Sequence, residues 1–194
     1  MGRCLGRIHA IGVTESFQHH QTLDSDSFGR EPFRYIMSTD FVPKDLREAY
    51  STLVEDVLKQ VQAGFDRAGM SEGKVAQLRL HGDVHPGNIL WTDGGPHFVD
   101  FDDARTGPAV QDLWMRLSGD LPQMTGQIDE VLAGYTEFMD FNPRELHLIE
   151  PLRTLRMMHY SAWLARRWDD PTFPMHFPWF GESRYWEEQI LALR

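Results

Sequence analysis

Two short polar motifs near the middle of the chain contain the residues best suited to chemistry. The first, from His81 to Asn88, reads His-Gly-Asp-Val-His-Pro-Gly-Asn, and the second is Asp100-Phe101-Asp102. Asp83 lies five residues before Asn88, and Asp100 follows Asn88 after a short hydrophobic run. One carboxylate that receives a hydroxyl proton, with an amide oxygen and a second carboxylate that hold Mg²⁺ on ATP, is the set that phosphoryl transfer requires. The two motifs therefore predict a phosphoryl-transfer site.

Each of the three residues has a predicted role and a structural alternative. We predict that Asp83 is the general base or the carboxylate that orients the acceptor hydroxyl, rather than a loop cap. Asn88 alone fits an Asx turn equally well, but its interval from Asp83 favours a Mg²⁺ ligand. Asp100 directly follows a hydrophobic strand, where only the loop or a cation can satisfy its charge, and we predict the cation.

The histidines and aspartates in and around the two motifs each have more than one possible role. His81 is expected to hold the loop by hydrogen bonds, and neither His81 nor His85 is predicted to be catalytic. His85 either contacts the phosphate or acceptor, or only packs. Asp102 and Asp103 either bind a second metal or cap the next turn, and we favour the structural role.

Two further charged residues follow the second motif. Arg105 either steadies a phosphate or forms a surface salt bridge. Asp112 lies near the start of a predicted helix, and a carboxylate there most often caps the helix or ties down the catalytic loop.

The predicted elements around the motifs explain how distant residues meet. Val75 to Leu80 is typical of a strand that leads into the first motif. Two more strands, Ile89–Trp91 and His97–Val99, flank a turn of Asp93-Gly94-Gly95-Pro96. A hairpin folds back on itself, so it returns the residues before and after it, Asn88 and Asp100, to the same end.

Apolar periodicity predicts a mainly helical chain around this hairpin. The expected helices are 1–11, 43–68, 110–115, 128–138, 144–168 and 182–193, with Gly69 as the stop of the second one. Residues 13–42 are expected to be irregular, with Pro32–Met37 as a semi-extended strip. Residues 171–180 contain three prolines and are expected to form an ordered strap rather than a regular helix. The predicted fold class is therefore α+β, mainly α, with a small β-hairpin.

Composition sets the limits of these predictions. The 194 residues are expected to form one domain. The net charge of −10 argues against a general nucleic-acid surface, which needs a basic stripe. The single cysteine, Cys4, excludes an internal disulfide. No stretch has the length of a membrane span or the core of a signal peptide, so we expect a cytoplasmic protein without membrane partners, and a monomer.

A two-metal phosphoesterase is the alternative to a phosphoryl-transfer site. The run from Gly82 to His85 also resembles the Gly-Asp-x-His element of two-metal phosphoesterases. Those sites need further ligands, typically from an upstream Asp-x-His and a Gly-Asn-His, and neither occurs in this sequence. Ligand counting therefore favours transfer from Mg·ATP.

The His-Gly-Asp-x-His-x-x-Asn pattern resembles the catalytic loop of the aminoglycoside phosphotransferase and choline kinase superfamily. Longer runs resemble one branch of it, the bacterial serine/threonine protein kinases of the stress response. These runs are Leu80–Trp91, Phe98–Arg105, Gly107–Ala109, Gln111–Met115, Asp40–Pro43 and Leu46–Tyr50. The resemblance implies a protein-kinase-like fold, ATP as co-substrate and Mg²⁺ as cofactor. It also implies that Asp83 is the proton acceptor, that Asn88 and Asp100 are the Mg²⁺ ligands, and that Asp100 counts as catalytic too.

The resemblance also sets expectations for the domain and for the acceptor. Kinases of this type are bilobal, and residues 1–80 contain no glycine-rich phosphate loop followed by a strand with the ATP lysine. We therefore expect residues 1–194 to be the C-terminal lobe alone, and we assign no residue to the nucleotide itself. The expected acceptor is a protein serine or threonine. The alternatives are a small hydroxyl compound of the aminoglycoside, choline or homoserine type, or a non-catalytic binding module.

Overall fold

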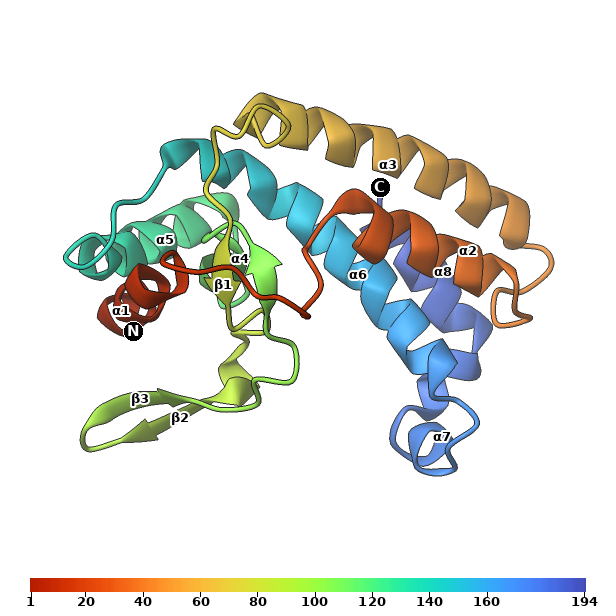
Figure 1. Cartoon of the computed structure of the whole chain (residues 1–194). Coiled ribbons are helices and arrows are strands. Elements are labelled where there is room, and N and C mark those ends of the chain that lie inside the picture. The colour runs from red at the N-terminus through yellow and green to blue at the C-terminus, as the bar shows by residue number, and fades with distance from the viewer. The chain divides into compact units, whose positions relative to one another are not determined.

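The computed structural model describes all residues from Met1 to Arg194, and the chain divides into two compact units. Unit 1 comprises Met1–Leu23 and Phe65–Ile149, and unit 2 comprises Asp24–Gly64 and Glu150–Arg194. Each unit is therefore built from two separate stretches of the chain, which the colours in Figure 1 follow. Both polar motifs belong to unit 1.

Unit 1 combines helices with two small antiparallel sheets. Strand β1 (Leu78–Leu80) pairs with β4 (Arg105–Gly107), and Leu80 lies opposite Arg105. Strand β2 (Ile89–Thr92) pairs with β3 (Gly95–Phe98), and Ile89 lies opposite Phe98. In Figure 1 the β2–β3 hairpin is an extended arm. In chain order the elements are α1 (Gly2–Gly12), β1 (Leu78–Leu80), the 3₁₀ turn η2 (Pro86–Asn88), β2 (Ile89–Thr92), β3 (Gly95–Phe98), β4 (Arg105–Gly107), α4 (Gln111–Trp114), α5 (Leu121–Tyr135) and the 3₁₀ turn η3 (Pro143–Leu148).

The core of unit 1 lies where α1, α4 and α5 meet the β1 strand. Its buried members come from both the helices and the loop that follows β1, so the first motif begins directly on the core. They are Leu5, Leu78, Leu80, Val84, Ile89, Ala109, Leu113, Ile128, Val131 and Tyr135. Burial of a side chain of this size stabilises the fold by roughly 1.5–3 kcal/mol.

Unit 2 is helical. Its elements are the π-helical turn η1 (Asp26–Arg30), α2 (Glu31–Met37), most of α3 (Arg47–Ala68), nearly all of α6 (Ile149–Arg166), α7 (Thr172–His176), the 3₁₀ turn η4 (Pro178–Gly181) and α8 (Ser183–Ala192). Aromatic contacts join α3 to the C-terminal segment: Trp186 is fully buried and meets Tyr50 edge to face, with ring centroids 5.5 Å apart. Phe180 packs on the same indole.

Most of the predicted elements are present. The helices at both ends, the long central helix with its stop at Gly69 (φ 81°), and the hairpin are confirmed. The mainly helical α+β fold class is also confirmed. Strand β4, which pairs with β1, was not predicted, because three residues of Arg-Thr-Gly carry no alternating pattern.

Two predictions are wrong because of where proline falls. Residues Pro32–Met37 were expected to be semi-extended but lie in α2, where Pro32 occupies the first turn and needs no N–H partner. Residues 144–168 were expected to be one helix. Instead η3 precedes α6, because the ring of Pro151 excludes an α-helical turn that would use the carbonyl of His147.

Other predicted boundaries move. The central helix begins at Arg47 instead of Pro43, after a separate turn in which Leu46 donates to the Pro43 carbonyl. Helix α5 begins at Leu121, earlier than expected, because Asp120 and Gln123 form a reciprocal capping box. The 171–180 strap contains one short helix, α7, with Pro174 in its first turn.

No helix is both long enough and apolar enough to span a membrane.

The crossing of α1 and α5 gives a test of the fold. A Cβ added at Gly6 would lie 2.5 Å from the backbone oxygen of Tyr135, which cannot rotate away. We expect Gly6→Ala to lower the free energy of unfolding by about 1–3 kcal/mol in urea titrations. Gly126→Ala on α5 is the control, since a Cβ there meets nothing within 4 Å and helix propensity favours alanine. Equal stability of the two variants would contradict this packing.

Candidate active site

The loop from β1 to β2 carries the first motif and is fixed by one buried carboxylate. Asp112, at the start of α4, is fully buried. Its Oδ2 accepts the N–H of His81 at 2.8 Å, and its Oδ1 accepts the N–H of Gly82 at 2.8 Å. Gln111 reinforces the tie, because its Nε2 donates to the Gly82 carbonyl at 3.0 Å. The expectation that Asp112 ties down the loop therefore agrees with the geometry.

Position 82 in this loop suits glycine and no other residue type. Its φ is 86°, a conformation that residues with a side chain rarely adopt. A Cβ there would also lie 2.2 Å from the backbone oxygen of Asp103 and 2.8 Å from Nε of Arg105. The loop therefore passes directly against the segment that follows the second motif.

A buried histidine on α1 completes the support of Asp112. The Nε2 of His9 lies 3.0 Å from Asp112 Oδ2, and its Nδ1 lies 3.0 Å from the Tyr135 hydroxyl. A carboxylate only accepts, so the ring donates to Asp112 from Nε2, whereas the Tyr135 hydroxyl is able to donate to Nδ1 or to accept from it. Burial raises the pKa of Tyr135, and the nearby Glu145 and Asp112 carboxylates add to it, which keeps the hydroxyl protonated.

The predicted helix over residues 1–11 contains His9, but the sequence analysis did not single this residue out. The available clue was its position four residues after Leu5, on the helix face that is otherwise apolar. A histidine on that face needs a buried partner, and Asp112 lies too far along the chain for sequence spacing to identify it.

Glu145 on η3 is a second buried carboxylate that the sequence did not single out. It is only 3 % exposed, and its Oε2 accepts the N–H of Val110 at 2.9 Å, next to α4. Burial raises the pKa of Glu145 to about 7, although hydrogen bonds from the Val110 and Ala109 amides oppose the shift. The pKa of Glu145 is set by burial and by backbone hydrogen bonds, with no contribution from a charged partner. Ionisation of Glu145 therefore lowers the stability of the fold.

Asp83 and Asn88 face each other across the turn of the loop. The Asn88 amide nitrogen donates to the Asp83 carbonyl at 3.1 Å and lies 3.5 Å from Asp83 Oδ2. Both partners are acceptors, so the amide presents its nitrogen to them and keeps its oxygen for another ligand. The Asp83 side chain is 13 % exposed, since the fully buried Val84 holds the backbone on the core.

The β2–β3 hairpin brings the second motif to the same end of the sheet. The Val99 N–H donates to the Asn88 carbonyl at 3.1 Å, which extends the pairing one step beyond the strands. Asp100 is the next residue and is exposed. Its φ is 63°, and it is the one non-glycine residue with a positive φ, a conformation that aspartate and asparagine tolerate better than other residues.

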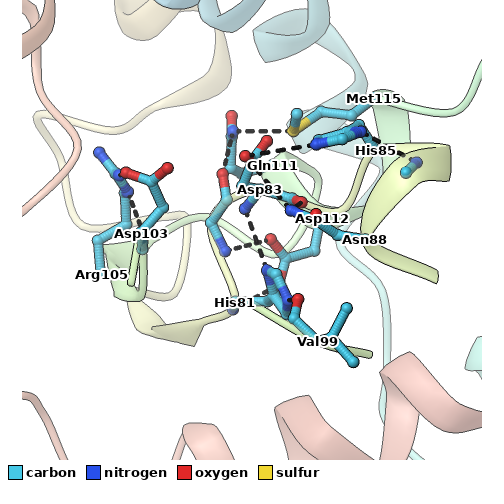
Figure 2. Close-up of polar contacts among 12 residues, drawn as sticks. His81, Asp83, His85, Asn88, Val99, Asp103, Arg105, Gln111, Asp112 and Met115 are labelled. Atoms are coloured by element: carbon cyan, nitrogen blue, oxygen red, sulfur yellow. Dashed lines mark hydrogen bonds and ion pairs between the residues drawn. The ribbon is translucent and has the colours of Figure 1, made fainter. Parts of the chain in front are cut away.

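His81 links the two motifs. Its Nε2 donates to the Val99 carbonyl at 2.9 Å, and its Nδ1 accepts the Asp83 N–H at 3.3 Å. Its ring also packs against Phe101, with centroids 4.4 Å apart. The expected role of His81 as a residue that holds the loop therefore agrees with this geometry, and Figure 2 shows His81 between Asp83 and Val99.

The residues after Asp100 have structural partners. Arg105 forms an ion pair with Asp103 and also donates from Nε to the Asp103 carbonyl at 2.6 Å. The Arg105 side chain is 8 % exposed and the Asp103 side chain is 46 % exposed, so a buried guanidinium meets a carboxylate at the surface, which agrees with the salt-bridge alternative for Arg105. This arrangement favours the structural interpretation of Asp103.

The comparisons with known proteins identify the family. The sequence model of the phosphotransferase enzyme family matches residues 1–149. The chain belongs to this family. Among phosphotransferase relatives, Stress response kinase A of Escherichia coli (strain K12) is 43% identical over 189 residues, which are 97% of this chain and 56% of that protein. Serine/threonine protein kinase RdoA of Salmonella typhimurium is 41% identical over the same shares.

Solved phosphotransferase structures share the fold. Amicoumacin kinase in complex with AMP-PNP, Ca²⁺ and Ami matches with a TM-score of 0.55 and 18% identity, over 93% of this chain and 55% of that one. Spectinomycin phosphotransferase in complex with ADP and spectinomycin matches with a TM-score of 0.52 and 15% identity, over 100% of this chain and 64% of that one. The chain spans a little over half the length of the curated relatives it matches.

The support of the loop gives a second prediction. Asp112→Ala leaves the N–H groups of His81 and Gly82 without their buried acceptor, so we expect the free energy of unfolding to fall by about 3–5 kcal/mol. Urea unfolding measures the loss, and amide hydrogen exchange at His81 and Gly82 shows whether it is local. Asp129→Ala, exposed on α5, is the matched control and should change stability by less than about 0.5 kcal/mol. Retained protection at both amides would disprove the tie.

Glu145 gives a third prediction, on pH. The pKa of Glu145 is higher in the folded than in the unfolded chain, so the folded state binds more protons between about pH 4.5 and 7. The protonated Glu145 therefore favours the folded state at low pH, and this contribution to the free energy of unfolding is lost as pH rises through that window. Glu145→Gln should therefore match the parent near pH 5 and exceed its unfolding free energy near pH 8, by up to about 3 kcal/mol. Glu130→Gln, exposed on α5, should show no such divergence. A pH-independent difference for Glu145→Gln would contradict the assignment.

Proposed function

We propose that this chain is the catalytic lobe of a kinase that transfers the γ-phosphate of Mg·ATP to a hydroxyl group. The observation that carries the proposal is the register of the β2–β3 hairpin. Through it, Asn88 and Asp100 lie at one end of the hairpin while the Asn88 amide contacts Asp83. Phosphoryl transfer relies mainly on positioning and charge stabilisation, and this arrangement supplies the residues for both.

The donor set suits a magnesium ion. The Asn88 amide oxygen and the Asp100 carboxylate are hard oxygen ligands, which Mg²⁺ prefers, and one or two protein ligands suffice when phosphates complete its coordination. No cluster of three or more His, Cys, Asp or Glu side chains is arranged as a metal site in the chain. The dense ligand set of a two-metal phosphoesterase therefore has no counterpart here. When bound, the magnesium ion would neutralise charge on the phosphates.

Asp83 is the proposed proton acceptor. Its carboxylate is mostly buried, and its backbone is held by Asn88 and by the neighbouring His81. A carboxylate held in this way can orient an acceptor hydroxyl for in-line attack and take its proton. Asp100 is proposed as catalytic because it would hold the magnesium ion on the phosphates. No residue is assigned to the nucleotide base.

We propose a protein serine or threonine as the acceptor, with a role in a stress response. The support is the similarity to Stress response kinase A and to a protein named as a serine/threonine kinase. A small hydroxyl compound is the alternative, and the amicoumacin and spectinomycin kinases that share the fold support it. The net charge of −10 also suits a cationic small acceptor.

We further propose that residues 1–194 correspond to the C-terminal lobe of a bilobal kinase that is monomeric and cytoplasmic. The family match over residues 1–149 and the share of the relatives that the chain covers support the lobe assignment. A non-catalytic binding module is the competing possibility, and nucleotide binding separates the two.

The fourth prediction tests the metal site. Calorimetric titration of Mg·ATP into this chain should show magnesium-dependent binding, which Asp100→Asn weakens by roughly tenfold or more through the loss of one ligand charge. Asparagine is chosen because it tolerates the left-handed backbone of Asp100, so the loss reports on charge. Asp93→Asn, in the exposed hairpin turn, is the matched control and should bind as the parent does. Unaltered binding by Asp100→Asn, or no binding by the parent, would argue against the proposal for this chain.

A further inference from the structure

We propose that His85 is a positioning residue that orients the Asp83 carboxylate through its Nε2–H. The inference rests on the proposed function, because it gives Asp83 the role of proton acceptor. His85 is the N-cap of the 3₁₀ turn η2 and lies between Asp83 and Asn88 in the loop. Its side chain is 40 % exposed, so the ring is not held in place by burial in the core.

The tautomer of His85 follows from its contact with Gly87. The Gly87 N–H donates to His85 Nδ1 at 3.0 Å, so Nδ1 is the acceptor. A neutral imidazole carries its proton on the other nitrogen when one nitrogen accepts a hydrogen bond. His85 therefore presents an Nε2–H on the side of the ring away from Gly87.

This N–H faces Asp83. His85 Nε2 lies 3.7 Å from Asp83 Oδ2, and the Asn88 amide nitrogen lies 3.5 Å from the same oxygen. Figure 2 shows the two donors converging on this carboxylate. Both separations exceed that of a strong hydrogen bond, but catalytic hydrogen bonds are often long in a ligand-free structure and shorten when substrate binds.

The loop is built to hold the ring in this place. The His85 N–H donates to the Asp83 carbonyl at 2.9 Å, and the Asn88 N–H donates to the His85 carbonyl at 3.0 Å. A Cβ at Gly87 would lie 2.7 Å from His85 Cε1 and 3.0 Å from Nδ1. A side chain at position 87 would therefore displace the ring from this place, and the Gly87 N–H selects the tautomer that aims a donor at Asp83.

The first arm of the test measures phosphotransfer by this chain. His85→Leu removes both ring nitrogens, and we expect kcat to fall between about tenfold and a hundredfold, because the carboxylate loses one of its orienting donors. The KM for ATP should stay within about twofold, since His85 acts on the acceptor side. His85→Gln keeps one acceptor and one donor and should recover most of the lost kcat. His97→Gln, on the exposed β3 strand, is the control and should leave kcat unchanged.

The second arm does not depend on activity. Nitrogen-15 NMR of the His85 ring should show a protonated Nε2 and an unprotonated Nδ1 in the parent chain, and faster exchange of the Nε2 proton with water in Asp83→Ala. A proton on Nδ1, or an exchange rate that Asp83→Ala leaves unchanged, would overturn the proposal. An active parent whose His85→Leu variant keeps its kcat would do the same. A parent with the expected NMR pattern but no phosphotransfer would support the His85 contact and count against the proposed function instead.

Discussion

The buried carboxylate of Asp112 is the constraint on which the rest of unit 1 depends. It accepts two backbone N–H groups from the loop and faces His9 on α1, so three separate stretches of the chain meet at one side chain. A buried charge is tolerated only when such donors surround it, and each donor in turn needs the charge. The same atoms therefore stabilise the fold and fix the shape of the loop that carries Asp83.

The β2–β3 hairpin determines the part of the site that Asp112 does not contact. Asp112 fixes the start of the loop, whereas the β2–β3 register decides where Asn88 and Asp100 end up relative to it. His81 connects these two devices, since its ring bonds to the backbone of Val99 and its amide bonds to Asp112. The site is thus assembled by backbone hydrogen bonds, and its functional side chains contribute little to the core.

The sequence could predict the parts of the site that follow local rules. The turn chemistry at Asp93 predicted the hairpin, and the hairpin predicted that Asn88 and Asp100 would meet. The sequence could not predict long-range partners. His9 and Glu145 each bond to a group more than thirty residues away, and no local pattern around either residue identifies that partner. The errors at Pro32 and Pro151 have a local cause: proline is compatible with a first helical turn but not with an interior one, and periodicity alone does not separate the two.

The two units are interleaved along the chain, and this has a consequence for synthesis. Unit 1 needs residues 1–23 and 65–149, so it is complete when residue 149 has been made, and the family match ends at the same residue. Residues 24–64 have by then left the ribosome without the segment 150–194 that completes unit 2. Tyr50 on α3 therefore lacks the indole of Trp186, its edge-to-face partner, until the last part of the chain has been made.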